Sequence, residues 1–391
     1  MNNIISLDDI FNAYYECRKN KRNTANAIKF EIDYENNLIE LWRELNENRY
    51  EIGRSIAFVT KYPKPREIFA ADFRDRVVHH LLIRYVKEEF YKEFIDNSFS
   101  CTEGKGILSG VMKFSSMLYE FTEGYTRDDC YIFKSDIKSF FMSINKDILF
   151  DIYTSTLMKI DLDINLKNLL AIIGNKIIYN RPELNCIIKG NPRDWDLLGP
   201  GKSLFTLDGS KGIPIGNITS QYLANLYMTS FDKFIAGYLG FKYYCRYVDD
   251  FILLVRDKEQ ILKALPDIRN FLYDKLRLTL HPDKLYLQHY TKGARFIGSV
   301  VKPGYIITSN RGVYNFISKL EEFENREYIN LEELRSSINS YLGIMSHCNN
   351  YNKRCRIINC EFINKLSRYI RVNRDLTKID LITKDKVIKL K

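Results

Sequence analysis

Two adjacent aspartates, Asp249 and Asp250, stand in the middle of the apolar stretch FKYYCRYVDDFILLV at residues 241–255. The flanking residues predict two short strands joined by a turn, which is a β-hairpin with carboxylates at its tip. Carboxylates in apolar surroundings are costly unless a cation lies beside them. Mg²⁺ is a natural partner, because it prefers carboxylate oxygens. A solvated acidic turn is the alternative interpretation, and the apolar flanks disfavour it.

A third acid follows a second predicted strand. Residues 130–136, CYIFKSD, alternate and are rich in β-forming residues, so we expect a strand that ends at Asp136. Three carboxylates at strand ends can hold two Mg²⁺ ions about 3.5–4 Å apart, and such a pair stabilises both the attacking and the leaving oxygen in phosphoryl transfer. The acids therefore predict a two-metal site.

The overall charge is compatible with this chemistry. The chain of 391 residues carries a formal net charge of +10, and Lys and Arg that neutralise phosphates favour a polyanionic partner. A generic basic enzyme would have the same charge. No run approaches the roughly 18 apolar residues that a membrane span needs. The first residues lack the apolar core of a signal peptide. We therefore expect a soluble, cytoplasmic protein with no membrane partner.

The eight cysteines form no C-x-x-C pair. Cys348, Cys355 and Cys360 lie close together beside His347, which makes a zinc site conceivable. Their spacing matches no common zinc pattern, so free thiols in a reducing cytosol are the expected state.

Apolar residues at three- and four-residue spacing predict helices in several parts of the chain. These parts are residues 6–50, 72–96 and 217–237, the last capped by Asn217 or Thr219, and most of the basic stretch 310–391. Residues 180–210 are rich in turn formers and are expected to be an insertion or a long loop. Residues 294–306 predict a hairpin with a Pro-Gly turn.

The order of the motifs is more specific than any one of them. It runs PKPREI, SDIKSFFMSI with Asp136, GIPIGNITSQ, RYVDDFILL, a Lys-bearing segment and then FIG. In this order the motifs resemble those of a reverse transcriptase, over about residues 25–350. REIFAADFRDRVVHHLL, DNSFSCTEGKG, KSLF and INSYLGIMSH are similar to the prokaryotic enzymes of diversity-generating retroelements and their phage-defence relatives. Group II intron enzymes usually carry Pro where this chain has Gln221, which argues against that branch.

The resemblance implies an α+β fold, the right-hand polymerase with fingers, palm and thumb. The palm would hold an antiparallel sheet packed on helices, and the thumb would be helical. The expected domains are N-terminal helices and fingers at 1–125, the first part of the palm at 126–155, fingers or insertion at 156–209, the second part of the palm with a primer-grip hairpin at 210–304, and a helical thumb with a basic tail at 305–391.

The resemblance also implies roles for the acids and their neighbours. Asp136, Asp249, Asp250 and the carbonyl of Ile137 match the ligands of two Mg²⁺ ions, which Mn²⁺ can replace. Lys284, in HPDKLYL, falls where polymerases place a lysine that protonates the leaving pyrophosphate.

Further residues match the nucleotide and primer sites. Lys64 and Arg66 would grip the triphosphate of the incoming dNTP, with a solvated basic loop as the alternative interpretation. Phe141 matches the aromatic steric gate that excludes a 2′-hydroxyl, with either Phe140 or Phe141 expected in the core. The dNTP site would also include Ile215, Gly216 and Gln221, and the primer grip would include Phe296 and Gly298. Ile215 replaces the Gln of many relatives, and in the diversity-generating branch an aliphatic residue accompanies error-prone copying of adenine.

The implied function is an RNA-directed DNA polymerase that makes cDNA, as in a diversity-generating retroelement. Its partners would be an RNA template, the RNA–DNA hybrid, dNTPs, a structured non-coding RNA and an accessory protein or further copies of itself. A phage-defence reverse transcriptase that copies a dedicated non-coding RNA shares this chemistry. An RNA-dependent RNA polymerase is disfavoured by Phe141, and a non-catalytic RNA-binding scaffold is disfavoured by the three intact acids.

Overall fold

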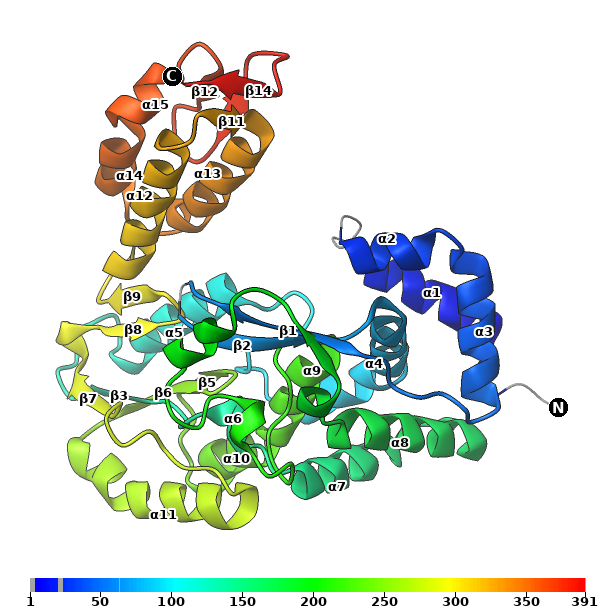
Figure 1. Ribbon diagram of the computed structural model, residues 1–391. Helices are drawn as coiled ribbons and strands as arrows, with labels where there is room; N and C mark the ends of the chain where they lie inside the picture. Colours follow the sequence, from blue (N-terminus) through cyan, green and yellow to red (C-terminus); the bar gives the residue numbers. More distant parts are fainter. Residues whose placement is uncertain (1–3, 20–23, 63, 391) are drawn as a thin grey trace. The chain divides into compact units, whose positions relative to one another are not determined.

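The computed structural model describes residues 4–19, 24–62 and 64–390 (Figure 1). The chain divides into two compact units, each assembled from separate segments. The first unit contains residues 1–103, 136–242 and 263–284, and the second contains residues 104–135, 243–262 and 285–391. Each unit combines helices with small sheets that are largely antiparallel, as the expected α+β class requires. No helix in the described ranges has the length and apolar character that crossing a bilayer requires.

The first unit begins with the predicted N-terminal helices. They are α1 (Leu7–Arg18), α2 (Ala25–Glu31), α3 (Tyr34–Asn46) and the long α4 (Phe73–Glu93). Side chains before two of these helices accept from backbone amides of the first turn, Ser6 from Asp9 at 3.1 Å and Asp72 from Arg74 at 3.0 Å. Such caps satisfy donors that the first helical turn leaves unpaired.

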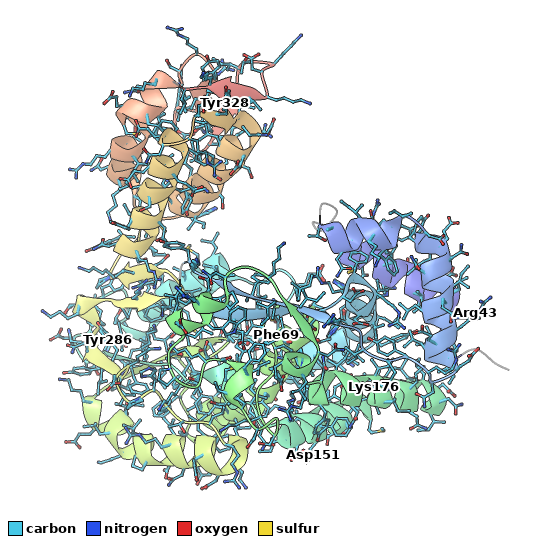
Figure 2. The ribbon with its side chains drawn as sticks, viewed as in Figure 1. Arg43, Phe69, Asp151, Lys176, Tyr286 and Tyr328 are labelled. Atoms are coloured by element: carbon cyan, nitrogen blue, oxygen red, sulfur yellow. The ribbon has the colours of Figure 1, made fainter. Side chains whose placement is uncertain are left out.

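The remaining helices of this unit are α6 (Phe140–Ser143), α7 (Lys146–Leu157), α8 (Ile164–Tyr179), α9 (Ile218–Tyr227), α10 (Thr229–Lys233) and the π-helical turn η4 (Phe234–Tyr238). Helix α11 (Lys258–Leu276) passes from the second unit into the first. The stretch 217–237, predicted as one helix, is therefore broken into three pieces. Lys176 of α8, labelled in Figure 2, donates to the carbonyl of Tyr50 at 2.6 Å and joins α8 to the N-terminal segment.

A three-stranded sheet in the first unit has the order β2-β1-β4. The antiparallel pair β1 (Ser55–Thr60) and β2 (Arg66–Ala70) is joined by β4 (Cys186–Ile188), which runs parallel to β1. The expected long loop at 180–210 thus contains a short strand. It also contains the 3₁₀ turns η1 (Pro182–Leu184), η2 (Pro192–Leu197) and η3 (Leu204–Thr206).

The second unit contains a four-stranded antiparallel sheet with the order β5-β6-β3-β7. Its strands are β3 (Tyr131–Ser135), β5 (Tyr244–Tyr247), β6 (Asp250–Val255) and β7 (Tyr286–His289). This sheet confirms the predicted strand at 130–136 and the predicted hairpin at 241–255. Helix α5 (Ile107–Phe121) packs against β5.

The rest of the second unit starts with the meander β8 (Ala294–Phe296), β9 (Ser299–Lys302) and β10 (Tyr305–Thr308), which extends the predicted hairpin by one strand. The helices α12 (Asn310–Glu324), α13 (Leu331–Ser346), α14 (Tyr351–Ile358) and α15 (Glu361–Lys365) follow, as expected. Four short strands were not predicted. They pair as β11 (Tyr328–Asn330) with β14 (Val387–Lys389), and β12 (Ile370–Val372) with β13 (Ile379–Leu381); Figure 2 labels Tyr328 on β11.

Candidate active site

The hairpin β5–β6 carries Asp249 and Asp250 at its tip. Tyr247 pairs with Asp250, so Val248 and Asp249 form the turn. Val248 has a φ of 56°, a left-handed conformation that is unfavourable for a β-branched residue. Such strain persists only where the surroundings hold the backbone in place, and it is often found at functional sites.

Arg246 holds this turn from below. Its side chain is fully buried, and its Nη1 donates to the carbonyl oxygen of Val248 at 2.8 Å. A buried guanidinium has to be hydrogen-bonded to be tolerated. The buried guanidinium of Arg246 is therefore a fixed hydrogen-bond donor to the strained residue Val248. Sequence reasoning missed Arg246, although a charged residue inside the apolar strand YCRY was a usable signal.

Lys134 supplies positive charge to the hairpin. Strand β3 pairs with β6, with Ser135 opposite Phe251, and the Lys134 ammonium lies 3.0 Å from Oδ1 of Asp250. Both side chains are about a quarter exposed, which makes the pair stronger than a fully solvated one. Residues two apart on a strand share a face, so Lys134 could have been found from its spacing to Asp136.

Asp136 is fixed within the first unit by the segment that follows α11. Its backbone oxygen accepts from the amide of His281 at 2.8 Å, and Ile137 forms an antiparallel bridge with Leu280. The ammonium of Lys284 forms an ion pair with Oδ2 of Asp136. The predicted acid and the predicted lysine are therefore direct neighbours.

The carboxylate oxygens of Asp136 and Asp250 are the type of donor atom that binds a hard divalent cation. Within the part of the chain that the structure describes, no three His, Cys, Asp or Glu side chains are grouped to hold one metal ion. Lysine ammonium groups lie instead against Asp250 and Asp136. Carboxylate oxygens that attract ammonium groups are the ligand type that Mg²⁺ prefers, whereas thiolates or imidazoles would favour zinc.

The segment GIPIG lies against β2 and α6 in the first unit. The amide of Phe69, labelled in Figure 2, donates to the carbonyl of Ile215 at 2.8 Å, and the amide of Ile213 donates to the carbonyl of Phe141 at 3.0 Å. Ile215 packs against a small core that includes Phe69 and Met142. The structure thus brings the predicted residues Phe141 and Ile215 onto one connected framework.

Gly216 permits this close approach. Its φ is +131°, and a Cβ there would lie 2.9 Å from both the backbone oxygen of Phe69 and the Cγ2 of Ile68. Only glycine fits such a position. Asn217 occupies the N-cap position of α9, as predicted, but its side chain makes no capping hydrogen bond to that helix. That side chain accepts from the amide of Ala71 at 3.1 Å instead, and Thr219 hydrogen-bonds His79.

The other predicted dNTP residues lie on the surface of the first unit. Lys64 is exposed in the loop between β1 and β2, Arg66 is exposed at the start of β2, and Gln221 is exposed on α9. Phe140 is buried, whereas Phe141 beside it is only half-buried. One ring of the pair is thus in the core, as expected, and the other remains accessible.

The predicted primer-grip residues lie at the turn between β8 and β9, with Phe296 at the end of β8 and Gly298 in the turn. Phe296 is fully buried, with its ring edge-to-face against Phe114 at 5.8 Å between centroids. Gly298 is exposed with a φ of +84°. In this conformation Phe296 anchors the hairpin, and the turn at Gly298 is the part that faces solvent.

Comparison with solved structures places the fold. Apo telomerase from Candida tropicalis aligns with a TM-score of 0.50 and 11% sequence identity, over 82% of this chain and 64% of that one. Telomerase from Candida albicans, solved with a fragment of telomeric RNA, aligns with a TM-score of 0.45 and 12% identity, over 78% of this chain and 55% of that one. The first likeness, at this low identity, shows the fold alone. Together with the antiparallel sheet and the helical C-terminal segment, it identifies a right-hand polymerase.

Sequence comparison gives the family. Protein YkfC of Escherichia coli (strain K12) is 28% identical over an alignment of 121 residues that covers 23% of this chain and 32% of that protein. The chain therefore spans about a third of this curated relative. The family model described as "Reverse transcriptase (RNA-dependent DNA polymerase)" matches residues 61–301, which is more than half of the chain. The chain belongs to the reverse transcriptase family.

Proposed function

We propose that the protein is an RNA-directed DNA polymerase that copies RNA into cDNA at a two-metal site. Asp136, Asp249, Asp250 and the carbonyl of Ile137 would hold two Mg²⁺ ions, or Mn²⁺ in their place. The register of β3 with β6 supports this proposal: Ser135, which precedes Asp136 in the chain, is opposite Phe251, which follows Asp250.

The lysines beside the acids have a part in this mechanism. Lys134 and Lys284 neutralise Asp250 and Asp136 until a cation takes their place. When bound, the metal ions would lower the pKa of the primer 3′-hydroxyl and offset the charge of the triphosphate. Once released from Asp136, the Lys284 ammonium is free to donate a proton to the pyrophosphate that leaves when the 3′-oxygen attacks.

The first unit would bind the incoming nucleotide. Lys64 and Arg66 would contact the triphosphate, with Arg suited to a two-pronged phosphate contact. The accessible ring of Phe141 would close the space below the sugar and so exclude a 2′-hydroxyl. Ile215 and Gly216 would shape the floor next to the base pair, near Gln221. In the second unit, the turn with Gly298, held by Phe296, would contact the primer.

Primer extension tests this proposal. An RNA template with an annealed DNA primer, Mg²⁺ and dNTPs should yield full-length cDNA. Asp249→Asn should reduce the rate at least about 100-fold, because the variant loses a charge that offsets the metal ions. Asp274→Asn is the matched control, since Asp274 is an exposed acid of α11. Equal activity of wild type and Asp249→Asn, or incorporation of NTPs instead of dNTPs, would contradict the proposal.

We further propose that the enzyme is error-prone opposite template adenine, as in a diversity-generating retroelement, with a structured RNA and an accessory protein or further copies as partners. Ile215 supports this, because an apolar side chain next to the base pair offers no polar check on the incoming base. Ile215→Gln should lower misincorporation opposite adenine about tenfold in sequenced cDNA. Ile172→Gln, at an exposed position of α8, is the control and should leave misincorporation opposite adenine unchanged.

The RNA and cDNA that copurify with the protein test the biological role. Template-repeat sequences with substitutions at adenines would support diversity generation. A faithful cDNA of one dedicated non-coding RNA would contradict it and favour the phage-defence role.

A further inference from the structure

A cavity of about 440 Å³ opens within residues 186–207, here called the insertion loop. This volume falls in the range of about 300–1,000 Å³ that is typical of small-ligand sites. Its walls are mainly apolar and include Ile188, Pro192, Trp195, Leu198, Pro200 and Phe205. None of these residues belongs to the proposed active site, so a ligand in this cavity would be bound separately from the groups held there.

The cavity is held in shape by a buried carboxylate of β2. Glu67 is 1% exposed and accepts three hydrogen bonds from the insertion loop. They come from Trp195 Nε1 at 2.7 Å, Ser203 Oγ at 2.6 Å and the amide of Leu204 at 2.7 Å. Hydrogen bonds to an ionised acceptor are among the stronger ones. The indole of Trp195 is therefore fixed before any ligand arrives.

Two aromatic rings form one wall. Trp195 and Phe205 meet nearly edge-to-face, with centroids 6.0 Å apart and an interplanar angle of 73°. Phe205 also contacts Phe69 at 5.6 Å, yet it remains 41% exposed. The rings are supported from behind while part of their surface is open. Such a surface is suited to stacking a planar group.

Positive charge lies in and next to the lining of the cavity. Lys202 lines it, and Lys189 and Arg193 follow the lining residues Ile188 and Pro192 in the chain. All three are exposed, and no carboxylate in the described ranges pairs with them. The acid Asp194 is neutralised by Lys61 at 2.9 Å. Asp196, which lines the cavity, offers an acceptor for an amino group. Cations around an aromatic wall favour a ligand that carries both a phosphate and a planar ring.

We propose that the insertion loop binds an unpaired nucleotide of single-stranded RNA, with the base stacked on Trp195 and Phe205 and the phosphate at Lys189 and Lys202. This rests on the proposed function, in which RNA is the template. Base faces are hidden in a duplex and open in a single strand, so only an unpaired nucleotide fits. Strand β4 pairs with β1 at one edge of the loop, so the bound nucleotide would lie beside the hairpin that carries Lys64 and Arg66.

Trp195 is a built-in reporter for this binding. The chain has two tryptophans, Trp42 and Trp195, so Trp42→Phe leaves Trp195 as the only indole. Titrating this variant with a single-stranded RNA 12-mer, without Mg²⁺ and at low salt, should quench its emission in a saturable way. The same sequence as an RNA duplex should not quench it.

Gly199→Leu, in the Trp42→Phe background, should fill the cavity. The three atoms nearest to a Cβ at Gly199 all belong to the flexible side chain of Lys202, with Nζ at 3.4 Å, so a side chain can start there without a backbone clash. RNA affinity should fall about 5- to 100-fold, the value of one stacked base. Gly237→Leu is the matched control, because a Cβ at this exposed glycine would meet nothing within 4 Å. Its affinity should be unchanged.

The outcomes separate the two proposals, because quenching needs no catalysis and is repeated with Asp249→Asn. Quenching by RNA that survives Asp249→Asn and is lost in Gly199→Leu supports the site even if primer extension fails. Equal quenching by a DNA 12-mer supports the same stacking for either single strand. Unchanged emission with RNA, equal loss in Gly237→Leu, or quenching by free nucleotides alone would overturn the proposal.

Discussion

The carbonyl of Val248 connects a buried charge to the proposed catalytic acids. Arg246 donates to this carbonyl, and the residue that follows it is Asp249. Arg246→Lys keeps the charge but loses the planar fork that directs the hydrogen bond. We expect kcat for primer extension to fall about 10- to 100-fold, since a misplacement of about 1 Å has such an effect, with little change in the KM for dNTP. Arg277→Lys, at an exposed position, should behave as wild type. A higher KM for dNTP with an unchanged kcat would contradict a positioning role.

A second buried group predicts how stability depends on pH. Burial raises the pKa of Asp75 from 3.8 to about 6, although Tyr50 and the amide of Gly53 donate to it at 2.9 and 2.8 Å. Because the pKa in the folded state lies above the unfolded value, the contribution of Asp75 is complete below about pH 3.8 and is lost as the pH rises through about 6.

Asp75→Asn removes this titration. Between pH 4 and pH 7 the free energy of unfolding of the wild type should fall by about 2 kcal/mol relative to the variant. Urea denaturation at a series of pH values measures the difference. Parallel pH profiles for the two proteins would show that Asp75 does not titrate as described.

Among the elements, the insertion loop and β2 depend on each other through Glu67. Its Oε1 accepts from Trp195 and Ser203, and its Oε2 accepts from the amide of Leu204. Glu67→Gln replaces one acceptor oxygen with an amide group that donates. This group would face a donor of the insertion loop, and the lost hydrogen bond costs about 1–3 kcal/mol of stability. We expect lower stability by this amount and a severalfold higher KM for dNTP, because β2 starts with Arg66. The exposed Glu103→Gln serves as the control in the same assays. An unchanged KM for dNTP would show that the hydrogen bonds of Glu67 do not position Arg66.

The sequence anticipated elements with strong local patterns and missed those whose partner is distant. Strands β3 and β6 have long β-rich runs, and α4 has a sustained apolar period, so all three were predicted. Strand β4 has three residues, and its partner β1 lies about 130 residues earlier in the chain. The strands β11–β14 are equally short. The stretch predicted as one helix breaks at Met228, between α9 and α10, and again where a π-helical turn follows α10, and apolar spacing registers neither change.

The same distinction applies to the candidate site. The acids were found because carboxylates in apolar strands are conspicuous in the sequence. Lys134 and Arg246 were missed although their places in predicted strands gave a signal, and Glu67 was missed because its partners lie about 130 residues later in the chain. Asn217 was assigned to the wrong partner for this reason: its side chain binds Ala71, 146 residues away, in preference to its own helix.

At the scale of the whole molecule, the excess of positive charge predicts how RNA binding depends on salt. The formal net charge is +10, and residues 305–391 contain 16 Lys and Arg against 10 Asp and Glu. Arg356, Arg368 and Arg374 in this segment are exposed, and no carboxylate in the described parts of the chain pairs with them. Each phosphate contact contributes about −0.7 to −0.9 to the slope of log affinity against log salt.

Changing these three arginines together to glutamine should therefore reduce the magnitude of that slope by up to about 2 to 3, measured by fluorescence anisotropy with a labelled RNA–DNA hybrid over a KCl series. Lys242, Lys275 and Lys292, three exposed lysines elsewhere, give a control triple variant with the same loss of charge. If only the net charge of the protein mattered, both triple variants would lose the same affinity for the hybrid. Their slopes of log affinity against log salt would then be similar. A larger change for the arginine variant would instead assign phosphate contacts to the C-terminal segment, because counterions are released only where a phosphate is contacted.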